Sequence, residues 1–442
     1  MKVPDSIYGL FIILTFPVLT FAQQMQQQEI LSDATLENCI QYAFKHQPVI
    51  QQSKLDEQIG ETVIKSKIAD WYPQVAANYS LQRYFDLPEG YSEGSFLTSG
   101  TFNTSSLGLS LNQNIFNNDI WLAKKSAEDV RRGYKQNTQQ NKIDLAADVS
   151  KSFYDVLLTQ KQVQVLDATI IRLERSRKDA FNQYNAGLVD KTDYKRATIE
   201  LNNAQSQRKQ TILSIQAKLV YLKGLIGYPD KEELRLQYDT MQLEKDADFD
   251  TLQTVNYSNR IEYQILQTQK RLQTADIKYR QYSFYPNVSA FGAYNLSYLN
   301  NSFSQLYGTS FPNSFIGLQI NYPLFQGGKR VQQYQEAKYE MKRLDWDVIA
   351  LQNRINTEYA QAISDYKSSL VNFLAVKDNY QLADDVYKTI TMQYRTGVKT
   401  YLEVLTAETD LRTTQINYYN ALLQLLVSKV DVEKALGILK TN

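Results

Sequence analysis

The sequence has 442 residues, with 48 Lys and Arg against 47 Asp and Glu, and it contains a single His and a single Cys. His46 and Cys39 alone cannot build a Cys/His zinc site or an intrachain disulfide, and a net charge of +1 argues against nucleic acid as a partner. Gly (17) and Pro (9) are together about half as frequent as usual, which favours long helices over a compact domain with many loops.

The first 22 residues have the pattern of a secretory signal peptide. Lys2 supplies a positive start, residues 8–19 are mostly apolar, and Thr20-Phe21-Ala22 fits a small-x-Ala cleavage site. The alternative is a transmembrane anchor, but the apolar run is short and Pro17 interrupts it. We therefore expect an exported protein with a cleaved leader.

From residue 30 the chain predicts helices and strands in alternation. A helix is expected over about 35–70, followed by strands at about 75–85 and 104–116 that a polar, Gly-containing loop joins. A helix of some 68 residues follows at about 119–186, because this stretch lacks Pro and its apolar residues recur with three-four spacing. Such a helix is about 100 Å long, which no globular domain needs.

A turn and a shorter helix at about 191–226 complete this unit, and the same pattern then begins again. The remaining elements are expected at 230–250 (an equatorial connection), 251–283 (helix), 288–298 and 314–325 (strands), a second long helix ending near Tyr394, and 400–438 (helix). In each half, two short helices end to end match the length of the long one.

The two halves are copies of one unit. Short motifs recur in the same order at offsets of 209 to 213 residues. The matching pairs are Trp71-Tyr72-Pro73 with Phe284-Tyr285-Pro286, Gly108-Leu109 with Gly317-Leu318, Gln183-Tyr184-Asn185-Ala186-Gly187 with Gln393-Tyr394-Arg395-Thr396-Gly397, and Leu225-Ile226-Gly227 with Ala435-Leu436-Gly437. Recurrence of this kind indicates a duplication, with 30–229 as the first structural repeat and 251–440 as the second.

Each strand carries apolar residues on one side and small polar residues on the other. In the first strand the two sets are Val75, Ala77, Tyr79 and Leu81, and Ala76, Asn78, Ser80 and Gln82. This alternation is typical of outer-membrane β-barrels, and the alternative is a soluble antiparallel sheet with one buried face. Four strands cannot close a barrel, and an edge in lipid leaves backbone groups unsatisfied. The barrel interpretation therefore requires several chains.

The order of elements and the turn motifs resemble the outer membrane efflux protein family, the TolC-like channels, over about residues 30–440. The most specific segments are the two tips, residues 184–193 and 394–407, the strand-to-helix turn Tyr322-Pro323-Leu324-Phe325-Gln326-Gly327-Gly328-Lys329, and Ala435-Leu436-Gly437. The resemblance implies a mainly α fold with a membrane β part, in which duplicated long-helix coiled-coil hairpins form a periplasmic α-barrel tunnel. The resemblance further implies a homotrimer in which each chain contributes four strands to a 12-stranded outer-membrane β-barrel.

The resemblance also implies function and partners. The implied function is that of a passive exit duct of a tripartite efflux or type I secretion system, in the outer membrane of a Gram-negative cell. The implied partners are outer-membrane lipid, a periplasmic adaptor (membrane fusion) protein and an inner-membrane RND, ABC or MFS transporter. The alternative function is that of a structural coiled-coil envelope protein without channel activity, which has no use for four amphipathic strands.

The two tips contain the candidate gating residues. Gly187 and Gly397 end the long helices, where a left-handed residue is usually Gly. The spacings Asp190…Asp193 and Thr400…Glu403 are those of capping boxes that start the return helices.

The family resemblance adds a second role at these tips. It makes Asp193 and Glu403 candidate carboxylates at the periplasmic aperture, and Tyr394 and Lys399 candidate latch residues. In three copies the carboxylates form rings that attract cations. Thr406 stands where the best-known member has a second aspartate. Lys399 replaces an arginine, which keeps the charge and loses the planar fork.

The sequence contains no set of residues that points to catalysis. His46 lies in a helical stretch beside Pro48, and Cys39 has the setting of a small buried residue. Gly327-Gly328 is not followed by the Lys-Ser/Thr of a phosphate loop. We therefore expect no enzyme, no catalytic residue, no cofactor and no metal site.

Overall fold

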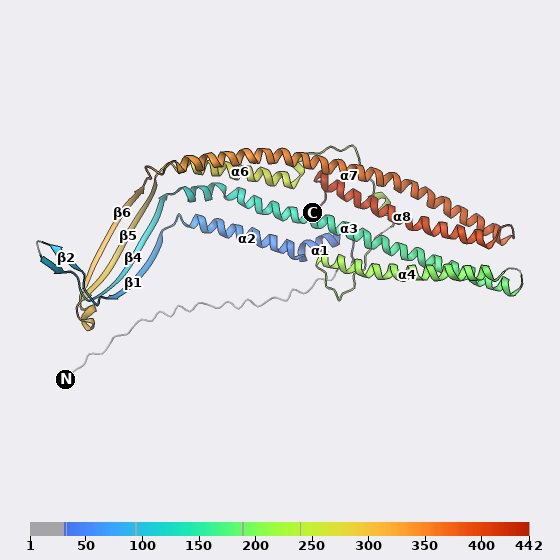
Figure 1. The fold of residues 1–442 in the computed structure, drawn as a ribbon, viewed down its shortest axis with the longest axis horizontal. Helices are drawn as coiled ribbons and strands as arrows, with labels where there is room; N and C mark the ends of the chain where they lie inside the picture. The colour runs from blue at the N-terminus through green and yellow to red at the C-terminus, as the bar shows by residue number, and fades with distance from the viewer. Residues whose placement is uncertain (1–30, 32, 93–94, 188–189, 239, 442) are drawn as a thin grey trace, which may run out of the picture.

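A computed structural model describes residue 31 and residues 33–92, 95–187, 190–238 and 240–441. The predicted signal peptide, residues 1–22, lies outside the described residues. The chain forms an elongated body of helices, with a sheet at one end and the two helix-to-helix connections, α3 to α4 and α7 to α8, at the other (Figure 1). None of the described helices combines the length and the apolar run needed to cross a membrane.

Two helices of 68 and 67 residues, α3 (Asn118–Asn185) and α7 (Lys329–Arg395), run the length of the body. Two shorter helices lie end to end along each of them (Figure 1). They are α2 (Pro48–Ala69) and α4 (Lys191–Ile226) along α3, and α6 (Ile261–Tyr282) and α8 (Tyr401–Leu436) along α7. Because α3 also packs against α6 and α8, the two repeats form one body.

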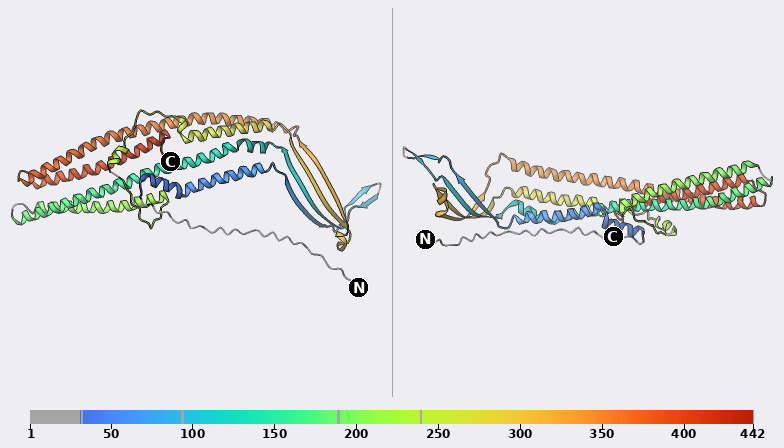
Figure 2. Two further views of the ribbon diagram at one scale, coloured as in Figure 1. Left: turned by 180° about the vertical axis from the view of Figure 1, so that it is seen from behind. Right: turned by 90° about the horizontal axis from the view of Figure 1, so that it is seen from below.

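The sheet joins the two repeats as well. Its four main strands are β1 (Gln74–Arg83), β4 (Asn103–Phe116), β5 (Asn287–Asn300) and β6 (Ser310–Asn321). They are antiparallel in the order β1-β4-β5-β6, so each repeat supplies one hairpin and the β4–β5 pairing connects the repeats. Figure 2 shows that the sheet is curved and that its strands continue into the helices. Within the described residues, β1 and β6 are the two edges.

The expected helix over 35–70 is two helices, α1 (Leu36–His46) and α2. Gln47 between them has extended backbone, with φ −68° and ψ 125°. The cause is the next residue, Pro48, whose ring disfavours helical geometry at the residue before it. The prediction of one continuous helix was therefore wrong at a position that the sequence itself marks.

Several other segments differ from the expectation. The strand expected at 314–325 is β6 at Ser310–Asn321, and it ends before Pro323, which has no N–H to donate to a sheet. The loop after β1 contains a hairpin of β2 (Glu89–Ser92) and β3 (Ser95–Thr98), and the connection between the repeats contains α5 (Thr240–Asp246). Helix α6 begins at Ile261, ten residues later than predicted, because the 3₁₀ turn η1 (Tyr257–Asn259) precedes it. The Asn256 side chain caps that turn. A second 3₁₀ helix, η2 (Phe303–Gly308), lies between β5 and β6.

The main hydrophobic core lies in the middle of the body, where α1, α3, α4, α7 and α8 meet the connection between the repeats. Its largest fully buried side chains include Phe153, Leu222, Tyr366 and Leu422, and the Tyr366 hydroxyl donates to the carbonyl oxygen of Ala247 at 2.9 Å. Cys39 is fully buried in this core, as predicted, and burial raises its pKa to about 12. Its thiol therefore stays protonated and unreactive.

Candidate functional site: the two helix tips and the sheet

The first tip, residues 186–190, joins α3 to α4. Gly187 takes a left-handed φ of +70°, which lets the chain leave α3 without steric cost. Asp190 caps α4: its carboxylate accepts from the backbone N–H of Thr192 at 3.0 Å and from the Thr192 hydroxyl at 3.1 Å. These hydrogen bonds lower the pKa of Asp190. Asp193, in the first turn of α4, is half-buried.

The second tip, residues 396–400, joins α7 to α8 and has more polar contacts. Gly397 has φ +81°, and Thr400 and Glu403 form a capping box. The Glu403 carboxylate accepts from the backbone N–H of Thr400 at 2.9 Å, and the Thr400 hydroxyl accepts from the backbone N–H of Glu403 at 3.4 Å. Lys399 Nζ lies 2.6 Å from the same carboxylate. The hydrogen bond from Lys399, with those from Thr400, lowers the pKa of Glu403 to about 2.

The two predicted capping boxes have different outcomes. The one at Thr400 and Glu403 is confirmed. The one at Asp190 and Asp193 is wrong, because the Asp190 carboxylate binds Thr192, and the backbone N–H of Asp193 donates to the Asp190 carbonyl oxygen at 3.3 Å. The Asp193 carboxylate is thus not engaged as the reciprocal acceptor of a capping box in the way that the Glu403 carboxylate is.

Tyr394 connects the two tips. Its hydroxyl donates to the side-chain oxygen of Gln183 on α3 at 3.1 Å, and its ring meets that of Tyr401 edge to face, with centroids 6.1 Å apart. Burial raises the pKa of Tyr394, and the negative charges of Asp179 and Asp193 add to that shift. The structure therefore brings predicted residues of both tips into one neighbourhood. Gln183 was visible in the sequence only as a repeated landmark, not as a contact.

A buried ion pair behind the tips holds the two hairpins together. Arg172 Nε of α3 lies 2.9 Å from Glu408 Oε1 of α8, and the Glu408 side chain is only 3% exposed. The Arg172 guanidinium also donates to Thr169 at 2.9 Å. Burial raises the pKa of Glu408, while Arg172 opposes that shift. Sequence reasoning missed this pair, because an isolated charge on a long helix looks like part of a solvated face.

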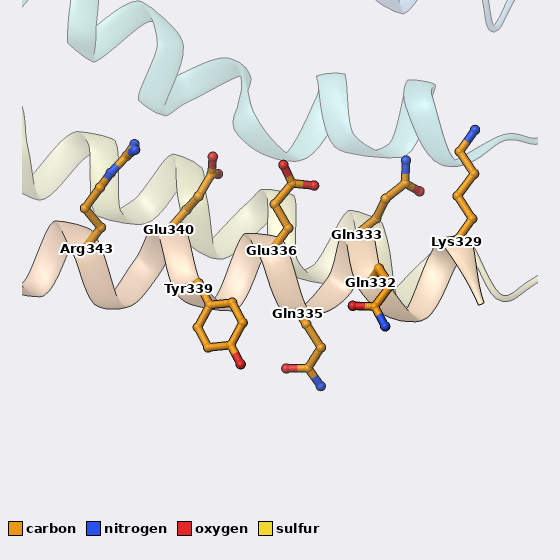
Figure 3. Close-up of a pocket in the computed structure, with 8 residues that line it drawn as sticks. All are labelled: Lys329, Gln332, Gln333, Gln335, Glu336, Tyr339, Glu340 and Arg343. Atoms are coloured by element: carbon orange, nitrogen blue, oxygen red, sulfur yellow. The ribbon is translucent and has the colours of Figure 1, made fainter. Parts of the chain in front are cut away.

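A surface hollow with a volume of about 590 Å³ lies on α7 near the sheet. All eight of its lining residues come from α7 (Figure 3). Lys329, Glu336, Glu340 and Arg343 extend toward the side on which α3 passes, while Tyr339 extends the other way. The two acids and two bases are spread along one helix and do not converge on a point, so the hollow has no catalytic geometry.

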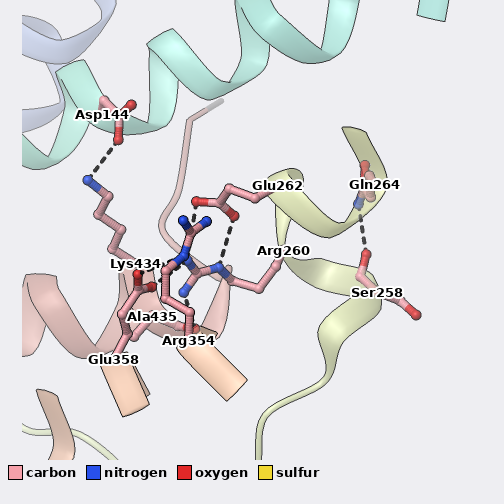
Figure 4. Close-up of polar contacts among 9 residues, drawn as sticks. All are labelled: Asp144, Ser258, Arg260, Glu262, Gln264, Arg354, Glu358, Lys434 and Ala435. Atoms are coloured by element: carbon pink, nitrogen blue, oxygen red, sulfur yellow. Dashed lines mark hydrogen bonds and ion pairs between the residues drawn. The ribbon is translucent and has the colours of Figure 1, made fainter. Parts of the chain in front are cut away.

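A second polar cluster lies where α6, α7 and α8 meet α3 (Figure 4). The Arg260 side chain, only 5% exposed, donates to Glu262 at 3.0 Å, to Glu358 at 2.8 Å and to the carbonyl oxygen of Ala435 at 2.8 Å. Lys434 pairs with Asp144 of α3 at 2.7 Å. These mutual pairings make the cluster a structural junction of the four helices. Among the described residues, no three His, Cys, Asp or Glu side chains gather to hold a metal ion.

The register of the sheet separates its two faces. Val75 lies opposite Leu111, Leu109 opposite Tyr294, and Val288 opposite Ile320, so apolar residues line one face across all four strands. Many of these side chains are exposed, Ile316 by 85% and Leu318 by 69%. The opposite face is mostly Ala, Asn, Ser and Gln. The alternation predicted from the sequence therefore exists in three dimensions. The apolar face is largely uncovered, except where Tyr307 of η2 contacts Tyr79 and Ser105 at one end of it.

The model of one protein family, described as outer membrane efflux protein, matches residues 39–228 and 259–438. The two segments fall within the expected repeats at 30–229 and 251–440, and together they make up most of the chain. The chain belongs to the outer membrane efflux protein family. It is accordingly an outer-membrane protein, as the sequence predicted.

Individual relatives are similar over most of their lengths. The outer membrane protein TolC of Escherichia coli K12 is 19% identical over 400 residues, which cover 89% of this chain and 80% of TolC. The alkaline protease secretion protein AprF of Pseudomonas aeruginosa is 21% identical over 404 residues, with 88% and 80% covered. The solved structure of the outer membrane protein VceC of Vibrio cholerae superposes with a TM-score of 0.71 at 16% identity, covering 91% of this chain and 96% of VceC. The efflux-protein fold predicted from the sequence is confirmed.

Proposed function

We propose that three copies of this chain form the outer-membrane exit channel of a tripartite efflux or type I secretion system. The observation that carries the proposal is the sheet: four strands with a largely uncovered apolar face, two open edges, and long helices continuing from the same strands. Three such sheets joined edge to edge give a 12-stranded barrel without an edge. The apolar face then contacts lipid, and the helices extend the channel about 100 Å into the periplasm.

The channel is proposed to be passive and not an enzyme. Transport energy comes from an inner-membrane RND, ABC or MFS transporter, and a periplasmic adaptor protein connects that transporter to the helical end. Support for both efflux and secretion comes from the family's description and from the name of AprF. Affinity purification of the chain from its own cells, followed by identification of the co-purified adaptor, distinguishes the two systems.

The helix tips are proposed to form the periplasmic aperture. Asp193, Tyr394, Lys399 and Glu403 are its candidate gating residues, because they lie at the end of the body opposite the sheet and Tyr394 bridges the two hairpins. Lys399 neutralises Glu403 within one tip. We therefore assign the larger part of the aperture's negative field to Asp193.

The channel proposal is tested with the purified full chain. It predicts a heat-resistant trimer in detergent and discrete single-channel currents in planar lipid bilayers. A monomer that conducts no current, even when Asp193→Ala, Glu403→Ala and Tyr394→Phe are combined to disrupt the tips, contradicts the proposal. Proteinase treatment of whole cells tests the alternative. A coiled-coil envelope protein without a channel predicts that the loop at 86–103 is inaccessible, whereas the channel predicts that it is accessible.

The aperture assignment is tested by ion selectivity. Reversal potentials in a KCl gradient are expected to show weaker cation preference in Asp193→Asn than in Glu403→Gln, because the Glu403 charge is already paired. Asp230→Asn, which removes an exposed carboxylate from the connection between the repeats, is the control. Equal effects of the Asp193 and Asp230 variants contradict the assignment.

A further inference from the structure

The polar face of the sheet is not uniform. Three phenylalanines of the second repeat, Phe291 on β5 and Phe311 and Phe315 on β6, lie on that face. Their positions follow from the register, because Phe315 pairs with Ala293 and Phe311 with Ser297, which are residues of the polar face. The corresponding face of β1 and β4 consists of small and polar residues. They are Ala76, Asn78, Ser80, Gln82, Thr104, Ser106, Gly108, Ser110 and Asn112.

Packing within the sheet accounts for only one of the three rings. Phe291 covers Gly317 on the neighbouring strand: a Cβ atom at Gly317 would lie 2.7 Å from the tip of the Phe291 ring. An aromatic ring over a glycine stabilises the pairing of two strands. Phe315 meets Phe291 edge to face, with centroids 6.1 Å apart and an interplanar angle of 67°.

The other two rings remain open to the solvent on this face. Phe311 is 50% exposed and Phe315 is 51% exposed. Their cross-strand partners, Ser297 and Ala293, are too small to cover them. In the proposed trimer β6 pairs with β1 of the next copy, whose residues on this face are Ala, Asn, Ser and Gln. Closure of the barrel therefore places no large apolar side chain over either ring, and both face the interior.

We infer that Phe311 and Phe315, with Phe291 behind them, form a binding patch for aromatic groups of solutes that pass through the barrel. This inference rests on the proposed channel and adds the chemical class that its wall prefers. The half-exposed rings offer edge-to-face and face contacts to aromatic groups, and cation–π contacts to aromatic cations. The three-fold assembly repeats the patch around the interior, so a solute is transferred between equivalent weak sites.

Single-channel blocking by two cations of equal charge tests the inference. Benzyltrimethylammonium and butyltrimethylammonium are added in turn on the barrel side of planar bilayers, and the dwell time of each block is measured. Wild-type channels are expected to hold the benzyl cation about tenfold longer. In the Phe311→Ser, Phe315→Asn double variant the benzyl dwell time falls to that of the butyl cation, which itself is unchanged.

Two further variants keep the outcome interpretable. Phe85→Ser changes an 86% exposed phenylalanine next to β1 and is expected to leave both dwell times unchanged. Phe311→Leu with Phe315→Leu keeps apolar bulk, so it supports assembly if the polar variant does not assemble, and it still shortens the benzyl dwell time. Equal dwell times in wild type, or equal changes for both cations, overturn the patch while the channel stands. Absence of any current, even when Asp193→Ala, Glu403→Ala and Tyr394→Phe are combined to disrupt the tips, overturns the channel, and the patch with it.

Discussion

The two tips derive from one duplicated unit, yet their polar side chains are organised differently. Gly187 and Gly397 give both the same left-handed turn. In the second tip the Glu403 carboxylate is held by Thr400 and Lys399, whereas in the first tip the cap is Asp190 and the next acid, Asp193, takes no part in a capping box. The duplication has therefore kept the backbone geometry and changed where negative charge is available.

The largest expected effect is on the contact between the two helical hairpins that carry the tips. Arg172→Met leaves the Glu408 carboxylate buried without its partner, which should destabilise the α3–α8 contact by about 3 kcal/mol. Hydrogen exchange followed by mass spectrometry should show faster exchange around Arg172 in α3 and around Glu408 in α8, to a similar extent.

A matched control uses the exposed ion pair of Arg208 with Asp167, where both side chains are about two-fifths exposed. Arg208→Met should change stability by about 0.5 kcal/mol or less. The Arg172→Met, Glu408→Met double variant should recover most of the lost protection, because apolar residues replace the whole pair. If Arg172→Met behaves like Arg208→Met, the buried pair does not hold the hairpins together.

The next largest effect is the loss of stability when the glycine of either tip is replaced, and it should be equal in the two tips. Gly187→Ala and Gly397→Ala each place a Cβ in the left-handed region, at a cost of about 1 to 2 kcal/mol, although no neighbouring atom is within 4 Å of either Cβ. Exchange of the last turn of α3 and of α7 should increase to the same extent. A clear difference would show that the duplicated turns are not equivalent in backbone energy.

A smaller effect should appear at the second tip when the pH falls. The folded pKa of Glu403, about 2, lies below its usual value of 4.5. Its contribution to capping α8 is therefore complete above pH 4.5 and is lost as the pH falls toward 2. Exchange of the first turn of α8, corrected for intrinsic rates, should rise by about threefold between about pH 6 and pH 3.

The Glu403→Gln variant provides the comparison, because its side chain does not titrate and its first turn should lack that pH dependence. The Asp190 cap has a lowered pKa as well, so the first turn of α4 should lose protection in acid in both proteins. A pH response of α8 that survives in Glu403→Gln would assign the effect to another group.

The smallest effect is expected when only the ion pair between Lys399 and Glu403 is removed. Lys399→Gln removes the partner of Glu403 and leaves the capping box in place. Because both side chains are more than one-third exposed, protection of α8 should fall by less than about twofold. Cation selectivity in bilayers should increase at the same time, since the Glu403 charge is then unpaired. An unchanged reversal potential would show that Glu403 does not face the ion path.

The sequence was sufficient for elements that depend on local chemistry. The absence of Pro from α3 and α7, and the apolar alternation of the strands, predicted the long helices and the four-stranded sheet. At Thr400 and Glu403 the side-chain lengths suit a reciprocal cap. The same spacing failed at Asp190, because the short aspartate carboxylate bonds to Thr192 one residue earlier.

Contacts between distant segments were beyond sequence reasoning. Arg172 and Glu408 are 236 residues apart, and only the packing of α3 on α8 brings them together. The aromatic patch was missed for a different reason. The strand was expected to begin at 314, but it begins at Ser310. Phe311 was therefore assigned to a loop, and the side of the sheet on which it lies could not be predicted.

The open edges of the sheet have a genetic consequence. A chain with one damaged edge, for instance a proline in the middle of β6, still offers a normal β1 to its neighbour and can enter an assembly that it cannot close. If the chain assembles as the proposed trimer, a cell that makes normal and damaged chains in equal amounts would have only normal chains in roughly one trimer in eight. Such an allele would therefore act dominantly, whereas an allele that removes the chain altogether would be recessive.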